Sequence, residues 1–103
     1  MNPKKFQTPY YAVIFTSKLK MKSKAYEEMA NIMFTLAQEQ QGFLGIESAR
    51  EDLGITVSYW KDLESIKIWK ENAAHQIAQE LGRNKWYAAY KVRIAKVERQ
   101  YEF

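Results

Sequence analysis

Aromatic and proton-carrying side chains gather in one stretch of the sequence, residues 60–87. This stretch holds all three tryptophans and the single histidine of a chain of 103 residues. An indole ring offers a flat apolar face and an N–H donor, which suits the binding of a planar aromatic molecule. An imidazole exchanges protons near neutral pH. The stretch therefore predicts a pocket for a flat aromatic ligand, with His75 as a general base or ligand at its mouth.

Three residues of this stretch, Trp69, His75 and Arg83, are the candidate catalytic residues. Arg83 follows a predicted helix and suits pairing with an anionic group of a substrate. Phe15 and Ser17 come near the end of an apolar strand, where a cavity would begin, and Ser17 offers a hydroxyl to a substrate oxygen. The residues expected to line the substrate pocket are Phe15, Ser17, Trp60, Trp86 and Tyr87.

Each of these residues also has a structural interpretation. A lone His75 without a paired carboxylate is more typical of a partly exposed helix histidine that bonds a neighbouring loop. Tryptophans more often fill cores and interfaces than line a ligand site. An arginine just past a helix, such as Arg83, more often meets solvent or the helix end. Both interpretations stay open on the residues alone.

The composition excludes several classes of function. The chain has no cysteine, so it forms no disulfide or thiolate metal site, which suits a cytoplasmic protein. One histidine is too few for a three-histidine site, and we expect no metal. The net charge is +4, but the basic residues do not interleave with aromatic ones, so no nucleic-acid partner is expected. No apolar run is long enough for a signal peptide or a membrane span.

Hydrophobic periodicity predicts six secondary-structure elements. They are a strand at Tyr10–Lys18, a helix from Ser23 to Gly42, strands at Phe43–Glu51 and Ile55–Trp60 joined by a short turn, a helix from Asp62 or Ser65 to Gly82, and a strand at Trp86–Val97. Asn72 and Ala73 are expected to break or bend the second helix. This order predicts an α+β fold, with a four-stranded antiparallel sheet and the helices on one of its faces.

The chain is expected to form one domain, residues 1–103, with a loose leader at 1–8 and a C-terminal extension at 97–103. The first predicted strand is apolar on both faces. Helices on one side cover only one face of a small sheet. We therefore expect a second copy to cover the other face in a two-fold homodimer, reached by the end of the long final strand.

Polar residues alternate between the two faces of the predicted strand 43–51. An inward Glu47 or Arg50 needs a partner, so an ion pair within the sheet is expected. Gly45 in the same strand predicts a bulge or a close approach of the backbone. The sequence thus gives Arg50 a structural role and not a place in the ligand site.

The chain resembles the antibiotic biosynthesis monooxygenase superfamily, the dimeric α+β barrel proteins. The similarity covers about residues 10–103. It rests on YYAVIF, QGFLGIESAR (41–50), GITVSYW (54–60) and the run WKENAAH…AQELGRNKWY…Y (69–90). It implies a ferredoxin-like βαββαβ subunit whose sheet packs on its twin, with a cavity between the sheet and the helices of each subunit.

The resemblance also implies a class of reaction. Enzymes of this superfamily include cofactor-independent quinol or anthrone oxygenases, in which the anion of the substrate itself passes an electron to dioxygen. Trp69 matches the pocket tryptophan on the second helix. Other members degrade haem and have an axial histidine further along that helix, where this chain has Gln79. Because His75 falls about one turn too early, no cofactor is expected, and haem is disfavoured.

The function predicted from residues and resemblance is that of a cofactor-independent monooxygenase. Its substrate would be a flat, electron-rich aromatic such as a quinol or an anthrone. Whether the protein is an enzyme stays open, because the sequence offers no paired acid and base. The alternative is a non-catalytic ligand-binding or stress-related module of the same fold, and a haem-binding or haem-degrading protein is a third. The expected partners are a second copy of the chain and a small aromatic molecule, with no membrane partner.

Overall fold

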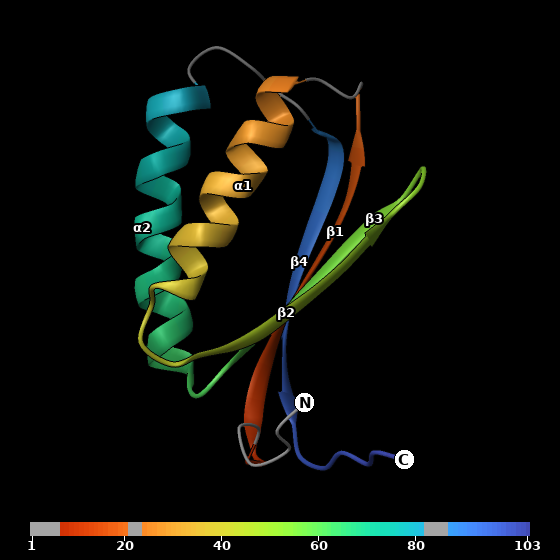
Figure 1. Cartoon of the computed structure of the whole chain (residues 1–103), viewed down its shortest axis with the longest axis vertical. Coiled ribbons are helices and arrows are strands. Elements are labelled where there is room, and N and C mark those ends of the chain that lie inside the picture. The colour runs from red at the N-terminus through yellow and green to blue at the C-terminus, as the bar shows by residue number, and fades with distance from the viewer. Residues whose placement is uncertain (1–6, 21–23, 82–86) are drawn as a thin grey trace.

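The fold is a single antiparallel sheet with two helices on one of its faces. The computed structural model describes residues 7–20, 24–81 and 87–103, except for the side chains of residues 25, 74–81 and 87. Its elements are β1 (Tyr10–Leu19), α1 (Lys24–Gln38), β2 (Phe43–Arg50), β3 (Gly54–Trp60), α2 (Leu63–Leu81) and β4 (Tyr87–Val97). The strands lie in the order β2-β3-β1-β4, and every neighbouring pair is antiparallel. The predicted α+β βαββαβ fold is confirmed (Figure 1).

The strand register decides which side chains lie beneath the helices. Tyr11 pairs with Trp60, and Ser17 pairs with Gly54. Because side chains alternate along a strand, the odd-numbered residues of β1 from Tyr11 to Ser17 share the face that carries Trp60. The even-numbered residues from Tyr10 face the side without helices. Figure 1 shows both helices on the same side of the sheet.

A compact cluster of apolar side chains joins the helices to the sheet. It consists of Val13, Ala37, Trp60 and Ile66, with Tyr11, Phe43 and Trp69 packed against it. The cluster draws on β1, α1, β3 and α2, so it links elements that lie far apart in the sequence. Its members explain the helical spacing of apolar residues along α1 and α2.

One expected irregularity is absent from the helices and another is present in the strands. α2 runs unbroken from Leu63 to Leu81, so the break expected at Asn72 and Ala73 is wrong; Ala73 is buried instead. The irregularity expected at Gly45 is confirmed by a shift of register between Phe43 and Gly45. The helix caps expected at Ser23 and Gly82 lie outside the described residues.

Asp62 begins α2, as one of the two predicted caps. Its Oδ1 accepts hydrogen bonds from the Ser65 N–H at 2.8 Å and from the Ser65 hydroxyl at 2.7 Å. These two bonds, the side-chain one first, lower the pKa of the Asp62 carboxyl from its usual 3.8. A side chain of this kind satisfies N–H groups that the first turn of a helix leaves unpaired.

Replacing this cap should lower the stability of the fold. We expect Asp62→Ala to reduce the free energy of unfolding by about 1 kcal/mol in urea denaturation, and Asp62→Asn, which also caps helices, to reduce it by much less. The folded carboxyl has the lowered pKa, so its contribution is present above pH 3.8 and is lost as the pH falls through the folded value. Equal stability of wild type and Asp62→Ala at neutral pH would contradict this role.

The face of the sheet without helices carries the other apolar row. Tyr10 and Ala12 are buried there, and Val57 and Tyr59 are half-buried. Tyr10 and Tyr59 meet edge-on at 5.8 Å, and the Tyr10 hydroxyl donates to Gln100 Oε1 at 2.5 Å. The segment 98–103 follows β4 without regular secondary structure and extends on the side away from the helices (Figure 1).

Candidate functional site

Two tryptophans lie at the centre of the helix–sheet interface. Trp60 ends β3 and is 0% exposed. Trp69 of α2 lies against it, with ring centroids 5.2 Å apart and ring planes inclined by 36°. Phe43 of β2 meets Trp60 edge-on at 5.5 Å. Aromatic rings favour such offset and edge-to-face arrangements, so β2, β3 and α2 together hold two of the tryptophans predicted to wall a pocket.

The indole N–H groups of these two tryptophans differ in their surroundings. Trp60 Nε1 donates to Ser58 Oγ at 2.9 Å. Trp69 Nε1 is buried, and no residue in the described part of the chain accepts its hydrogen bond. A buried donor left unpaired costs about 1–3 kcal/mol. Such a group in a folded protein calls for an explanation, and an acceptor oxygen on a bound ligand would supply one.

Phe15 and Ser17, which were predicted to line the same pocket, lie at the other end of the sheet. Tyr11 is the β1 residue opposite Trp60, whereas Ser17 is opposite Gly54. Tyr11 and Ser17 are separated by about 20 Å, since a strand rises about 3.3 Å per residue. The structure therefore divides the predicted lining into a tryptophan group and a second group around Ser17.

The second group is organised by Arg50. Its Nη2 donates to the Ser17 hydroxyl and its Nη1 to the Ser17 carbonyl at 3.4 Å. The guanidinium lies 6.0 Å from the centre of the Tyr26 ring of α1. Beside it, Phe15 and Tyr90 stack with centroids 5.6 Å apart and planes inclined by 28°. A cation and two aromatic rings thus share the helix side of the sheet.

The ion pair expected within the sheet is wrong. Glu47 and Arg50 lie on opposite faces of β2, as the pairing of Glu47 with Val57 and of Arg50 with Gly54 requires. Glu47 Oε1 accepts a hydrogen bond from the Tyr59 hydroxyl at 2.6 Å, and Arg50 bonds Ser17. Both polar side chains find neutral partners.

The remaining predicted site residues lie partly or wholly outside the described residues. Arg83 and Trp86 are outside them, and Tyr87 is described only as the first backbone residue of β4. The backbone of residue 75 lies in α2. A helix turns about 100° per residue, so position 75 is about 120° around the axis from Trp69. The catalytic roles of His75 and Arg83 stay predictions.

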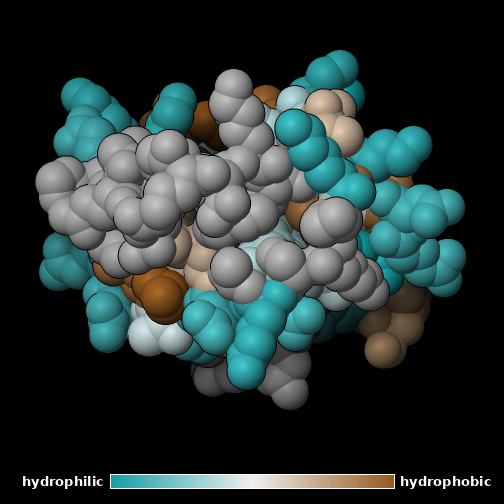
Figure 2. Space-filling view, turned by 90° about the horizontal axis from the view of Figure 1, so that it is seen from above, coloured by the Kyte–Doolittle hydropathy of each residue, from teal (hydrophilic) through white to brown (hydrophobic). Residues whose placement is uncertain are grey.

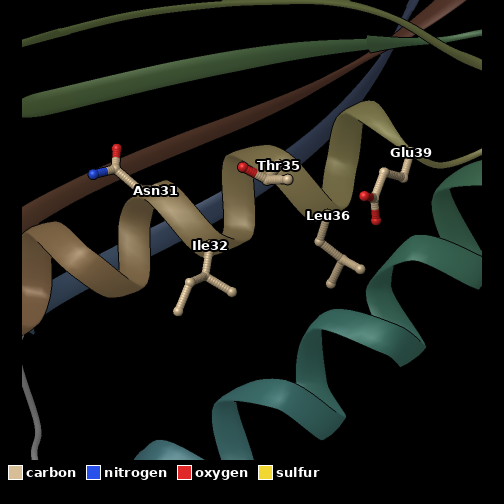
Figure 3. A pocket seen from close by; sticks show the side chains of 5 residues that line it. All are labelled: Asn31, Ile32, Thr35, Leu36 and Glu39. Atoms are coloured by element: carbon tan, nitrogen blue, oxygen red, sulfur yellow. The ribbon is translucent and has the colours of Figure 1, made fainter.

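Surface hollows occur on the helix layer. One of about 330 Å³ is lined by Asn31, Ile32, Thr35, Leu36 and Glu39 of α1. Figure 3 shows the side chains of Ile32 and Leu36 pointing to the side on which α2 lies. None of the predicted site residues lines this hollow, and its wall offers no arrangement of catalytic groups.

The end of the molecule near the start of α1 and the end of α2 is seen in Figure 2. On the described surface of this end, hydrophilic residues predominate and hydrophobic ones show in separate places. Across the described ranges, no three histidine, cysteine, aspartate or glutamate residues lie close enough to hold a metal ion. Neither described helix is long and apolar enough to cross a membrane.

The Tyr59 phenol has a strongly raised pKa. Burial first, and then the hydrogen bond and charge of Glu47, raise the pKa of Tyr59 from 10.0 to about 12. We expect an ultraviolet titration to show a phenol near this pKa that is lost in Tyr59→Phe. In Glu47→Gln the pKa should fall only in part, because burial remains.

The sign of the stability change follows from the raised pKa. The folded state binds this proton more tightly than the unfolded chain, so the contribution is present below pH 10 and is lost as the pH rises towards 12. An unchanged titration curve in Tyr59→Phe would contradict the assignment.

Sequence reasoning missed Arg50, Tyr26 and Tyr90 as members of a possible site. The alternation along β2 does not say which face looks toward the helices, and the partners of Arg50 come from β1 and α1. One local signal was present: Gly54 follows Arg50 across a tight hairpin and pairs with it. A glycine in a strand often marks the close approach of another group.

The chain has similar proteins both in sequence and in structure. No known family profile matches the chain. The chain is 50% identical over 96 residues to the uncharacterized protein YqjZ of Bacillus subtilis, which covers 91% of this chain and 84% of that protein. Half of the aligned residues are therefore shared along nearly the whole length.

Solved structures similar to the chain share its fold at low sequence identity. One is SnoaB, a cofactor-independent oxygenase from Streptomyces nogalater, with a TM-score of 0.71 and 9% identity over 90% of this chain and 97% of that chain. Another is a protein from Nitrosomonas europaea proposed to be an antibiotic biosynthesis monooxygenase, with a TM-score of 0.66 and 17% identity over 87% of this chain and 91% of that chain. The chain belongs to the family of YqjZ and has the fold of the antibiotic biosynthesis monooxygenase superfamily.

Proposed function

We propose that the protein is a cofactor-independent monooxygenase acting on a flat, electron-rich aromatic such as an anthrone or a quinol, bound beside Trp69. The observation that carries the proposal is the buried Trp69 N–H without an acceptor in the described part of the chain. The shared fold with SnoaB, a cofactor-independent oxygenase, supports the class of reaction.

The reaction on an anthrone can be written with the substrate as the only reductant. Loss of a proton from the ring CH₂ gives an anion, which passes electrons to dioxygen. One oxygen atom becomes the new C=O, and the other leaves as water with the two hydrogens of the CH₂ group. No external electron donor is needed, which agrees with a cofactor-free site.

The protein would favour this reaction by stabilising the anion. Negative charge develops on the oxygen of the ring when the proton leaves, and an aligned N–H donor in a buried site lowers the energy of that charge. Trp69 Nε1 is such a donor, and the indole face offers a stacking surface. Arg83 is our candidate for a second group that stabilises the anion, a role that rests on the sequence. His75 was predicted as the base, but position 75 lies about 120° around α2 from Trp69, so we assign it no step beside that ring.

Oxygen uptake with a panel of anthrones and quinols tests the proposal. We expect the purified protein to accelerate oxygen uptake over buffer without any added cofactor. One dioxygen should be consumed for each anthrone oxidised, with one oxygen atom in the product and one in water. A protein that binds the panel but gives no acceleration would be the non-catalytic ligand-binding module, and the monooxygenase proposal would then be abandoned.

Haem is the alternative cofactor within this fold. An axial ligand would have to come from His75, but position 75 of α2 is out of phase with Ile66, Trp69 and Ala73, the row that packs toward the sheet. The described residues therefore do not fit a haem held beside Trp69. A Soret band on haemin titration that disappears in His75→Ala would overturn this conclusion.

We also propose that two copies pair through the face of the sheet without helices. Its centre holds Tyr10, Ala12 and Ile14 of β1, and Ile55 of β3 is exposed there. Tyr101 and Phe103 in the segment after β4 are exposed on the same side, the first by 76%. Apolar side chains placed this way suit a self-complementary two-fold interface. The proposed location is the cytoplasm, which a chain without cysteine suits.

Sedimentation at micromolar concentration tests the pairing. We expect the mass of two chains for the wild type and of one chain for Ile14→Glu, because a carboxylate would be buried without a partner in the interface. Glu28→Gln, at an exposed position of α1 on the other side of the sheet, is the control and should remain paired. A wild-type protein that sediments as one chain would refute the pairing.

A further inference from the structure

Four residues form a row across the sheet at the end remote from the tryptophans. Arg50 of β2 pairs with Gly54 of β3, Gly54 pairs with Ser17 of β1, and Ser17 pairs with Tyr90 of β4. All four lie on the helix side, because paired residues share a face. Gly54 and Ser17, in the middle of the row, have the smallest side chains. The surface of the sheet is therefore low between the Arg50 guanidinium and the Tyr90 ring.

The guanidinium of Arg50 extends over Gly54 to Ser17. It donates to the side chain and the carbonyl of Ser17, which is 2% exposed. Arginine has five N–H donors, so further N–H groups remain after these two bonds. In the described part of the chain no carboxylate pairs with Arg50. A half-buried cation held by neutral partners is suited to an anion from outside the chain.

Gly54 makes room for this arrangement. A Cβ atom at position 54 would overlap Cζ and Nη2 of Arg50. The guanidinium therefore lies directly against the backbone of β3, where any other residue would displace it. Tyr26 of α1 closes over it from the helix side at 6.0 Å, within the range of a cation–π contact.

An aromatic surface adjoins the cation. Tyr90 pairs with Ser17, and Phe15 stacks on Tyr90. Tyr90 is 64% exposed, and its neighbours Val92 and Ile94 on the same face of β4 are about half exposed. A flat ring laid on this surface would place a substituent beside Ser17 and Arg50.

We infer that the row Arg50–Gly54–Ser17–Tyr90 is a binding site for an aromatic carboxylate. The carboxylate accepts hydrogen bonds from the remaining N–H groups of the Arg50 guanidinium, which the buried Ser17 holds in place, and the ring lies on Tyr90 and Phe15. Guanidinium and carboxylate match in a two-bond geometry that a lysine cannot reproduce. Ser17 is about 20 Å along β1 from Tyr11, the residue opposite Trp60, so this site is separate from the proposed monooxygenase site.

Isothermal titration with 2-naphthoate and the uncharged 2-naphthalenemethanol tests this inference on the full chain. We expect 2-naphthoate to bind the wild type at least about 10-fold more tightly than 2-naphthalenemethanol. Arg50→Ala should weaken 2-naphthoate about 10- to 100-fold and change the affinity for the alcohol less than about twofold. Lys70→Ala removes one positive charge at an exposed position of α2 and should change neither.

Two further variants keep the test decisive if Arg50→Ala folds poorly. Gly54→Ala retains every charge but displaces the guanidinium, and Arg50→Lys retains the charge without the fork, so both should weaken 2-naphthoate about 10-fold or more. Equal losses in Arg50→Ala and Lys70→Ala would show only general charge attraction and would overturn the site. So would equal affinities for the two compounds, or no binding of either.

The outcome can be separated from that of the proposed function. Trp69→Phe should leave the affinity for 2-naphthoate unchanged, whereas it should lower oxygen uptake. Naphthoate binding that depends on Arg50 without any oxygen uptake would support this site and refute the monooxygenase. Oxygen uptake with no dependence of naphthoate binding on Arg50 would support the monooxygenase and refute this site.

Discussion

Replacing Trp69 by phenylalanine should lower the turnover number for an anthrone about 100-fold and leave the stability of the fold nearly unchanged. The rate falls because the variant loses the N–H that would stabilise the developing anion, an effect typical of a lost donor to an oxyanion. The smaller ring loses packing, which lowers stability, but the substitution also removes a buried donor without an acceptor, which raises it. These two terms offset to within about 1 kcal/mol.

Trp60→Phe is the matched control for this experiment. It makes the same chemical change, but the Trp60 N–H is bonded to Ser58 Oγ at 2.9 Å. Both the packing and the hydrogen bond are lost, so we expect the free energy of unfolding to fall by about 2 kcal/mol or more. Oxygen uptake and urea denaturation of both variants give the comparison. Equal stability losses in the two variants, with no difference in rate, would show that Trp69 only fills the core.

Trp60→Ala should have the largest effect on stability of any substitution considered. Trp60 is fully buried and contacts Phe43, Trp69 and the apolar cluster around Val13. Removing an indole from such a place typically costs about 3–5 kcal/mol. The total stability of a domain this small is about 5–15 kcal/mol, so the variant should unfold at much lower urea or not fold at all.

Ile68→Ala is the control for Trp60→Ala. Ile68 lies on α2 and is 47% exposed, and alanine is the better helix former. Its free energy of unfolding should change by less than about 1 kcal/mol. A loss in Trp60→Ala no larger than in Ile68→Ala would contradict the central packing role of Trp60.

The fold could be predicted from the sequence because its signals are local. A run of β-branched and aromatic residues marks β1, alternating apolar residues mark β3, helical spacing marks α1 and α2, and Asp62 marks the start of α2. The wrong break at Asn72 and Ala73 shows the limit of such signals. Asn72 is a poor helix former, but Ala73 packs into the interface, and tertiary burial outweighs the local preference.

The candidate site could be predicted only in part. Trp60 and Trp69 were expected near each other and do pack together, because the strand and helix that carry them are neighbours in the chain. Ser17 was expected in the same pocket, but the register of β1 against β3 places it opposite Gly54. That register depends on pairing between distant strands, and neither composition nor spacing along one strand determines it.

The partners of Arg50 could not be predicted from the sequence either. The sequence places Arg50 three residues after Glu47 on one strand and predicts an ion pair within the sheet for an inward Glu47 or Arg50. The structure places them on opposite faces, so Glu47 meets Tyr59 and Arg50 meets Ser17. Side chains alternate along a strand, so residues three positions apart point to opposite faces, and each of these two side chains bonds a neutral partner instead.

A crystal structure of the protein with bound anthraquinone, the product class of an anthrone oxygenase, tests directly whether a flat aromatic molecule binds beside Trp69. We expect the ring to lie between the sheet and α2, with a quinone oxygen about 3 Å from Trp69 Nε1. A ring found instead in the hollow of α1 around Ile32 and Leu36, with the Trp69 N–H still unpaired, would contradict it.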